Sequence, residues 1–212
     1  MTDDAQRVLI AGGGPAGMSA AVFLLAEGVP VTVLERSVTP HADPRAATYH
    51  PPTLEMFEPS GVTAELHARG IVTPHWQYRD RQNGLIAQFD LGVLAADTRY
   101  PYRLQCEQHK LVAMLERRVV EHPLARVLHG AELVGVTQND EQVQIEVRHP
   151  NGGSERFQGK WLIGADGGRS LVRKSQDIGF EGFTWPERFL VITTTFDFAT
   201  LGYAYSSYTM DP

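Results

Sequence analysis

The sequence of 212 residues contains a single cysteine, Cys106. One cysteine cannot form an internal disulfide, and it excludes metal sites built from paired cysteines. The eight histidines show no metal-ligand spacing, and no His-x-x-x-His pattern falls on an expected helix. We therefore assign no metal site.

Clustered positive charge is also missing. The formal net charge is −6 and the sequence contains no run of basic residues, which argues against nucleic acid as a partner. No apolar run is long enough to cross a bilayer, and the first residues, Met-Thr-Asp-Asp, lack the basic and apolar regions of a signal peptide. We expect a cytoplasmic protein without membrane contact.

A glycine-rich turn near the N-terminus is the strongest motif. An apolar run from Val8 leads into Gly12-Gly13-Gly14-Pro15-Ala16-Gly17, and a helical pattern follows. Gly12 permits a sharp turn after a strand, Gly14 lets a pyrophosphate approach the backbone, and Gly17 lets the helix pack closely. The positive end of the helix would face the phosphates. This pattern predicts a dinucleotide-binding unit.

The second strand of that unit is expected over 31–34, and it ends in Glu35. An acid about 20 residues beyond the glycines is typical of a ribose-binding carboxylate. The alternative is a structural turn followed by a surface glutamate.

The middle of the chain predicts a loop over 37–52, a short helix over 53–57 with Thr53 as N-cap, and a helix over 62–69 that Gly70 ends. The residue pattern over 71–102 is typical of strands, and Asn83-Gly84 is a hairpin signal. An amphipathic helix is expected over 108–120.

A β-meander follows, with strands over 131–138, 142–148 and 157–163. A plain NAD dehydrogenase would continue with βαβ units, so a meander points to a flavin-binding fold. The last strand enters Gly164-Ala165-Asp166-Gly167-Gly168-Arg169-Ser170, a second junction of strand, glycine turn and helix. Asp166 is placed to bind sugar hydroxyls, although Asp-Gly also favours turns without a ligand.

After Gly182, strands are expected over 189–198 and 203–208, and the sequence stops beside a strand with an unpaired edge. Domains seldom end in this way. We therefore expect this sequence to be the N-terminal part of a longer or split protein.

On these motifs the chain resembles the class A flavoprotein aromatic hydroxylases, the FAD-dependent monooxygenases typified by para-hydroxybenzoate hydroxylase. The first glycine motif with Glu35-Arg36 matches their first FAD motif, and Gly164-Ala165-Asp166-Gly167 matches their Asp-Gly motif. The loop around Arg45 fits the family loop that brings an arginine near the flavin, and Gln108 fits a glutamine that contacts FAD. A third family motif, Gly-Asp with nearby Ala and His, has no match here.

The resemblance implies a set of cofactor-binding residues and assigns no catalytic acid, base or nucleophile. Arg45 could instead be a solvated loop arginine, and Gln108 an ordinary first helical residue with Gln105 as its nearest competitor. The implied set is Gly12, Gly13, Gly14, Pro15, Ala16, Gly17, Glu35, Arg36, Arg45, Gln108 and Asp166.

The implied fold class is α/β, a Rossmann-like FAD-binding domain with a β-meander and the start of a mostly β substrate domain. We expect the FAD-binding domain over 1–70 and 104–180, and the substrate region over 71–103 and 181–212. Trp76, Tyr78, Phe89, Tyr100 and Tyr102 would line a pocket or simply pack on the sheet.

The resemblance further implies that NADH or NADPH reduces FAD and that O2 then hydroxylates a phenolic or polycyclic aromatic ring. A missing C-terminal half or a homodimer partner would supply the rest of the site. The alternatives are a related flavin-dependent reductase, epoxidase or halogenase, or a non-catalytic FAD-binding module.

Overall fold

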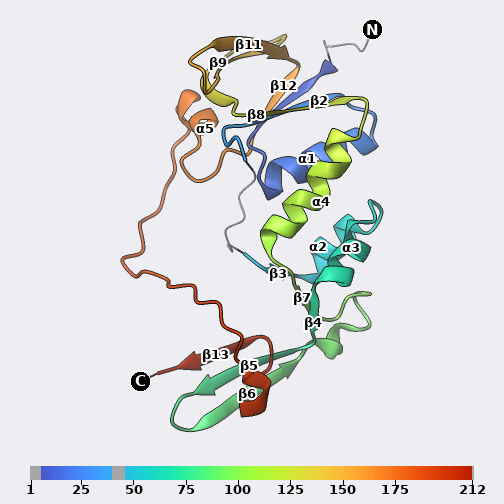
Figure 1. Ribbon diagram of the computed structural model, residues 1–212, viewed down its shortest axis with the longest axis vertical. Coiled ribbons are helices and arrows are strands. Elements are labelled where there is room, and N and C mark those ends of the chain that lie inside the picture. The colour runs from blue at the N-terminus through green and yellow to red at the C-terminus, as the bar shows by residue number, and fades with distance from the viewer. Residues whose placement is uncertain (1–5, 40–45, 212) are drawn as a thin grey trace. The chain divides into compact units, whose positions relative to one another are not determined.

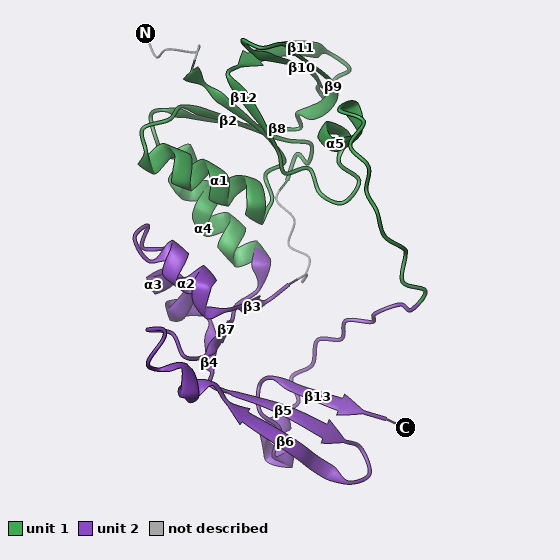
Figure 2. Cartoon of the chain, turned by 180° about the vertical axis from the view of Figure 1, so that it is seen from behind, with its two compact units in different colours: residues 1–43, 109–186 green, residues 44–108, 187–212 purple. Residues whose placement is uncertain are grey.

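The computed structural model describes residues 6–39 and 46–211. The chain forms two compact units, which Figure 2 shows in different colours. Unit 1 comprises residues 1–43 and 109–186, and unit 2 comprises residues 44–108 and 187–212. Each unit is described by itself.

Unit 1 is built on a four-stranded parallel sheet in the order β12-β1-β2-β8. Its strands are β1 (Val8–Ala11), β2 (Val31–Glu35), β8 (Ala125–His129) and β12 (Trp161–Gly164). The central strands β1 and β2 are apolar and buried, as strands covered on both faces must be. The sequence pattern predicts β1 and β2, whereas no pattern marks β8.

Helix α1 (Pro15–Ala26) follows β1 and returns the chain to β2, which gives the predicted βαβ unit. Gly28, with a φ of +74°, lies just beyond the helix end, where a left-handed residue is favoured. Helix α4 (Gln108–Val120) has the predicted bounds, and its buried residues are Leu111, Met114, Leu115 and Val119.

The predicted meander consists of β9 (Glu132–Gln138), β10 (Val143–Arg148) and β11 (Ser154–Gly159), all antiparallel. It packs on the parallel sheet, so that Leu9 and Leu34 share one buried cluster with Val143, Ile145 and Val147. Figure 1 shows the meander on the side of the sheet away from α1.

The single strand predicted over 157–163 was wrong, because the chain forms two strands there. Residues up to Gly159 pair with β10, whereas Trp161 begins β12 and pairs with β1. The break falls at Lys160, whose backbone N–H donates to the Arg7 carbonyl at 2.8 Å. The two halves of this β-prone segment therefore pair with strands of two different sheets.

Helix α5 (Leu171–Ser175) follows the second glycine turn, as predicted. The strand predicted over 189–198 was wrong: the segment has no strand partner among the described residues, and Phe189 is 90% exposed. Apolar, β-branched residues favour a strand, but a strand also needs a neighbour to receive its backbone hydrogen bonds.

Unit 2 contains two small sheets. One has the order β13-β5-β6, with β5 (His75–Asp80) and β6 (Gly84–Asp90) forming the predicted hairpin. Strand β13 (Ser207–Met210) joins it in parallel with β5 and falls partly within the predicted strand over 203–208. The other sheet has the order β3-β7-β4, from Thr48–Tyr49, Arg103–Gln105 and Ile71–Thr73.

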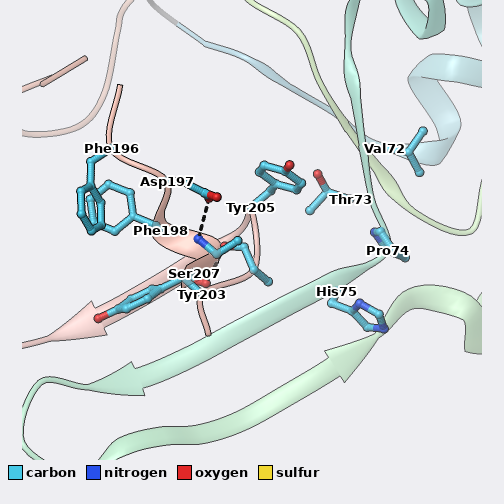
Figure 3. A pocket seen from close by; sticks show the side chains of 12 residues that line it. Val72, Thr73, Pro74, His75, Phe196, Asp197, Phe198, Tyr203, Tyr205 and Ser207 are labelled. Atoms are coloured by element: carbon cyan, nitrogen blue, oxygen red, sulfur yellow. Dashed lines mark hydrogen bonds between the residues drawn. The ribbon is translucent and has the colours of Figure 1, made fainter. Parts of the chain in front are cut away.

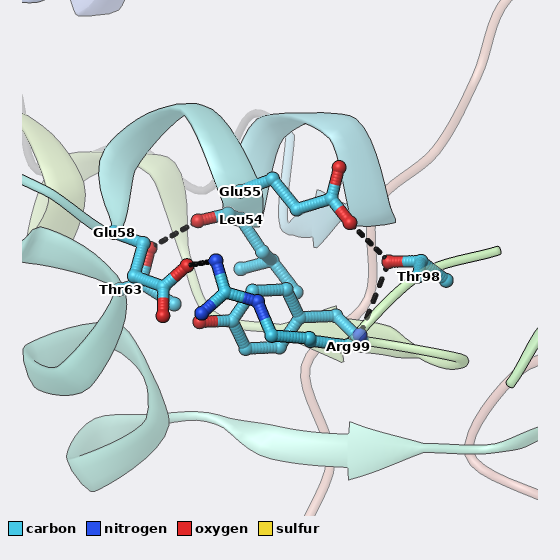
Figure 4. A network of polar contacts seen from close by, with 7 residues as sticks. Leu54, Glu55, Glu58, Thr63, Thr98 and Arg99 are labelled. Atoms are coloured by element: carbon cyan, nitrogen blue, oxygen red, sulfur yellow. Dashed lines mark hydrogen bonds and ion pairs between the residues drawn. The ribbon is translucent and has the colours of Figure 1, made fainter. Parts of the chain in front are cut away.

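Two short helices, α2 (Pro51–Phe57) and α3 (Val62–Arg69), complete unit 2 together with the 3-10 turns η2 (Leu91–Leu94) and η3 (Phe198–Leu201). Thr53 is not the N-cap of α2, because the prolines occupy the first turn and His50 precedes them. Polar contacts tie these helices to one another and to the loop before β7 (Figure 4): Thr63 donates to the Leu54 carbonyl, Thr98 donates to Glu55, and Arg99 pairs with Glu58.

The position of Leu9 between the sheet and the meander gives a stability prediction. Leu9 is fully buried, so Leu9→Ala should lower the free energy of unfolding by about 2–5 kcal/mol through lost burial and a residual cavity. Chemical denaturation measures this. Val120→Ala is the control, because Val120 is 61% exposed and should change stability by less than about 0.5 kcal/mol. Equal effects of both variants would contradict this packing.

Candidate functional site

The two glycine turns of unit 1 lie against each other at the carboxyl ends of β1 and β12. The strands pair in parallel with Ala11 opposite Gly164, and the Ala165 N–H donates to the Ala11 carbonyl at 2.8 Å. Gly12 has a φ of +106°, and a Cβ there would lie 2.3 Å from the Ala165 carbonyl oxygen. Only glycine therefore permits this contact between the turns.

The N-terminus of α1 opens at the same edge of the sheet. Gly14 is the N-cap residue, Pro15 begins the helix, and the first turn contains no acidic residue. The N–H groups of a first helical turn have no acceptor within the helix, so this end retains unneutralised positive character. A Cβ on Gly14 would meet nothing within 4 Å, whereas one on Gly17 would lie 1.9 Å from the Gly12 carbonyl oxygen.

Glu35 lies at the carboxyl end of β2, next to the first glycine turn. Its Oε2 accepts from the Gly13 N–H and its Oε1 accepts from the Ser37 N–H, both at 2.8 Å. These two bonds fix the orientation of the carboxylate. The Gly13 N–H is thereby committed to Glu35. Ser37 is a contact that sequence reasoning missed, since no motif marks it.

Asp166 lies in the second glycine turn and holds the start of α5. Its Oδ2 accepts from the N–H groups of Leu171 at 2.7 Å and Val172 at 3.2 Å. Its Oδ1 is buried and has no hydrogen-bond partner in the described part of the chain. A buried carboxylate oxygen without a donor is costly, so this atom has the capacity to accept a hydrogen bond from a bound group. The turn-forming role and the ligand role are therefore compatible.

The structure says less about the other predicted cofactor-binding residues. Ala16 belongs to the first turn of α1, and Arg36 is an exposed residue directly after Glu35. Gln108 is the first residue of α4 and belongs to unit 2, where its N–H donates to the Ala46 carbonyl at 2.9 Å. Its competitor Gln105 accepts from the Thr48 hydroxyl at 2.9 Å. Arg45 lies outside the described residues, so its role stays a prediction.

The residues of unit 1 fit the ADP half of FAD. The open backbone at Gly14 and the positive helix end suit a pyrophosphate, and the Glu35 carboxylate suits ribose hydroxyls. The unpaired Asp166 Oδ1 suits a further sugar or ribityl hydroxyl. We found no metal-ligating group of three or more His, Cys, Asp or Glu within 6–39 and 46–211. Over the same residues, none of the helices has the length and hydropathy to span a membrane.

Unit 2 contains a cavity of about 670 Å³, shown in Figure 3. It lies on the Gln77 face of the β13-β5-β6 sheet, since His75 and Ser207 line it and Ser207 also bonds Gln77. Its aromatic lining comes from Phe196, Phe198, Tyr203 and Tyr205. None of the five aromatic residues singled out in the sequence lines it.

Two of those five residues pack around a helix instead. His67 on α3 bonds the Thr63 carbonyl through Nδ1 at 2.7 Å and the Tyr102 hydroxyl through Nε2 at 2.8 Å. A carbonyl only accepts, so the neutral ring carries its proton on Nδ1 and Tyr102 donates. Burial raises the pKa of Tyr102 further above neutral, so its hydroxyl is protonated and can donate. Tyr100 stacks beside them, 5.6 Å from the His67 ring.

The two glycines of the α1 turn give opposite predictions. Gly17→Ala should cost about 1–3 kcal/mol of stability through overpacking, more than the roughly 1 kcal/mol that alanine adds to a helix. Gly14→Ala should cost less than about 1 kcal/mol, because its Cβ meets no protein atom, yet weaken FAD binding about tenfold by blocking the phosphate approach. Thermal melts and FAD titrations of both variants measure this. A Gly14→Ala protein with unchanged FAD affinity would contradict the assignment.

Comparison with known proteins gives several relatives. Para-nitrophenol 4-monooxygenase of Pseudomonas sp. (strain WBC-3) is 34% identical over 205 residues, which cover 97% of this chain and 51% of that protein. Pentachlorophenol 4-monooxygenase of Sphingobium chlorophenolicum is 30% identical over 188 residues, covering 86% of this chain and 34% of that protein. The chain thus spans about half the length, or less, of the curated relatives it matches.

Solved structures agree with the sequence comparison. The crystal structure of p-nitrophenol 4-monooxygenase from Pseudomonas putida DLL-E4 matches with a TM-score of 0.89 at 32% identity, over 97% of this chain and 52% of that one. Aklavinone-11 hydroxylase in complex with FAD and aklavinone matches with a TM-score of 0.75 at 28% identity, over 86% of this chain and 36% of that one. These matches confirm the predicted α/β fold class.

A family profile described as "FAD binding domain" matches residues 5–207. That range includes both glycine turns, Glu35 and Asp166, and the relatives that share it are aromatic monooxygenases. The resemblance read from the two motifs is therefore confirmed, and the chain belongs to the FAD binding domain family of aromatic monooxygenases.

Proposed function

We propose that this chain is the FAD-binding part of an NAD(P)H-dependent monooxygenase that hydroxylates a phenolic or polycyclic aromatic substrate. The observation that carries the proposal is the pair of glycine turns in contact, with a fixed carboxylate on one side and an unpaired buried carboxylate oxygen on the other. Relatives that match this chain are named as monooxygenases of para-nitrophenol and pentachlorophenol.

In this proposal the protein's own groups hold the cofactor. Glu35 accepts hydrogen bonds from the adenosine ribose, since its carboxylate is oriented by Gly13 and Ser37 at the carboxyl end of β2, where such an acid binds ribose. The N-terminus of α1 faces the pyrophosphate, and Asp166 Oδ1 accepts from a hydroxyl of the cofactor. When bound, FAD supplies the redox chemistry, accepting electrons from NAD(P)H and using O2 to oxygenate the aromatic ring.

The carboxylate of Glu35 also makes the site selective. A ribose 2′-hydroxyl can donate to it, whereas a 2′-phosphate would bring like charge against a carboxylate that two backbone bonds hold in place. The site of unit 1 therefore suits a cofactor whose adenosine carries free ribose hydroxyls, as FAD does. No side chain is assigned as general acid, base or nucleophile.

For the roles of the two domains we retain the ranges predicted from the sequence. We propose residues 1–70 and 104–180 as the FAD-binding domain and residues 71–103 and 181–212 as part of the substrate region. The apolar segment between α5 and β13 is strongly exposed, with Leu190 at 83% and Ile192 at 74%. We propose that a further part of the enzyme covers it, with a homodimer partner as the alternative. A cytoplasmic location likewise stays a prediction.

The test is to load the chain with FAD and follow both cofactor binding and turnover. The proposal expects a flavin absorbance spectrum that stays with the protein, and NAD(P)H oxidation coupled to O2 uptake when a phenol is added to the complete enzyme. Bound FAD without any such turnover would favour a non-catalytic FAD-binding module. Failure to bind FAD would overturn the proposal.

Asp166 provides the sharpest single-residue prediction. Asp166→Asn keeps the size of the side chain but removes its charge, and it should weaken FAD binding about 10- to 100-fold, as expected for a lost hydrogen bond to a charged group. Flavin fluorescence titration measures this. Asp140→Asn, an exposed residue of the same unit, is the control and should leave the affinity unchanged. An equal loss of FAD affinity in both variants would indicate an effect of net charge and not of the Asp166 Oδ1 atom.

A further inference from the structure

One face of the β13-β5-β6 sheet in unit 2 carries four aromatic rings, from Trp76, Tyr78, Phe89 and Tyr208. Register places Phe89 opposite Trp76 and Tyr208 opposite Tyr78. The ring centroid of Trp76 lies 5.1 Å from that of Tyr78 and 5.7 Å from those of Phe89 and Tyr208. These spacings are typical of interacting aromatic rings, so the four form one continuous surface, here called the ring face.

The two faces of this sheet differ in what covers them. On the opposite face Gln77 is buried, and Arg79 donates to Gln77 and to the Gly202 carbonyl, both at 2.9 Å. On the ring face the side chains stay accessible, with Phe89 49% exposed and Tyr208 54% exposed. Exposed apolar patches of this kind are typical of surfaces that contact a ligand or another part of a protein.

A cation without an anion lies at the ring face. The Arg103 guanidinium is half-buried and stacks over the Trp76 ring, with Cζ 4.2 Å from its centroid. Its one hydrogen bond in the described residues goes to the Ser206 hydroxyl at 3.3 Å, and no carboxylate there pairs with it. A guanidinium has five N–H donors and pairs best with a carboxylate or similar planar oxyanion.

A second donor beside this cation also lacks an acceptor. The Trp76 indole nitrogen is buried and has no hydrogen-bond partner in the described part of the chain. Two other arginines of the same sheet region do reach oxygen partners: Arg79 bonds carbonyl groups and Arg81 bonds Asp211 at 2.7 Å. The Trp76–Arg103 pair instead presents adjacent N–H donors with no carboxylate or other anionic acceptor among the described residues, so it suits a ligand that brings negative charge.

We propose that the ring face is the binding site for the aromatic ring of the substrate, and that Arg103 holds an anionic substituent on that ring, a phenolate or carboxylate. This rests on the proposed function and deepens it, because it names the substrate as an anionic aromatic and assigns a specificity-determining residue. Stacking supplies the affinity for the ring, and the guanidinium selects the charged form over the neutral one.

The cavity on the other face of the sheet suits such a ligand less well. No arginine or lysine lines it, and Asp197 does. Its polar groups already serve the protein, since Asp197 accepts from the Ala199 N–H at 2.9 Å and Ser207 donates to the Ala204 carbonyl at 2.8 Å. An anion entering there would meet a carboxylate instead of a cation.

The experiment compares a charged and a neutral aromatic ligand of the same shape. The FAD-loaded chain is titrated with 4-nitrophenol, at a pH where this phenol is ionised, and separately with nitrobenzene. Quenching of tryptophan fluorescence and equilibrium dialysis both report binding. Arg103→Met should weaken 4-nitrophenolate binding about 10- to 100-fold and change nitrobenzene binding less than about twofold. Arg103→Lys should recover part of the loss.

Two further variants separate this site from general effects. Arg79→Met removes a stacked arginine from the opposite face of the same sheet and should leave 4-nitrophenolate binding unchanged. Trp76→Phe should remove most of the ligand-dependent quenching while retaining ring binding in dialysis. A thermal melt of each variant identifies any that fail to fold.

The proposal is overturned if Arg103→Met weakens the binding of 4-nitrophenolate and of nitrobenzene equally, or if Arg79→Met weakens 4-nitrophenolate binding as much as Arg103→Met does. It is also overturned if neither ligand binds the wild-type chain. It is also overturned if Phe89→Ser leaves ligand binding intact but dissociates a dimer of the chain in sedimentation, since the ring face would then contact a second copy. Retention of FAD in the same samples keeps these outcomes separate from failure of the proposed function.

Discussion

The close contact between the two glycine turns is the constraint on which the candidate site depends. Parallel pairing of β1 with β12 aligns Ala11 with Gly164, and the chain then has to turn sharply on both strands at once. A Cβ on Gly12 would lie 2.3 Å from the Ala165 carbonyl oxygen, so a larger residue would push the turns apart. The two acidic groups and the end of α1 lie at the same edge of the sheet because β1, β2 and β12 run parallel and each group follows the carboxyl end of its strand.

Backbone N–H groups orient both acidic side chains of this site. Glu35 receives the N–H groups of Gly13 and Ser37, and Asp166 receives those of Leu171 and Val172. Each carboxylate is therefore held before any ligand arrives, which limits the side-chain entropy that binding would otherwise cost. The two carboxylates differ at one atom: both oxygens of Glu35 accept a backbone N–H, whereas Asp166 Oδ1 has no donor among the described residues.

In unit 2 the alternation of side chains along one strand separates a packed face from an exposed face. On β5, Gln77 and Arg79 point to a face filled by polar contacts with the segment before β13, while Trp76 and Tyr78 point to the exposed ring face. Since successive side chains of a strand lie on opposite faces, one short strand contributes to both faces. Arg103 comes from the other sheet of unit 2 and adds charge to a surface that is otherwise apolar.

Local patterns in the sequence determined most of unit 1: the βαβ unit with Glu35, the amphipathic helix α4, the meander, and the second glycine turn. Each depends on residues that are close in the chain, so periodicity and glycine placement suffice to predict it. Only the tertiary structure decided that residues 157–163 divide between two sheets, that 189–198 forms no strand, and that Arg103 lies over Trp76. Those features depend on which distant segment supplies a hydrogen-bond partner or a ring, and a single sequence does not specify such long-range pairings.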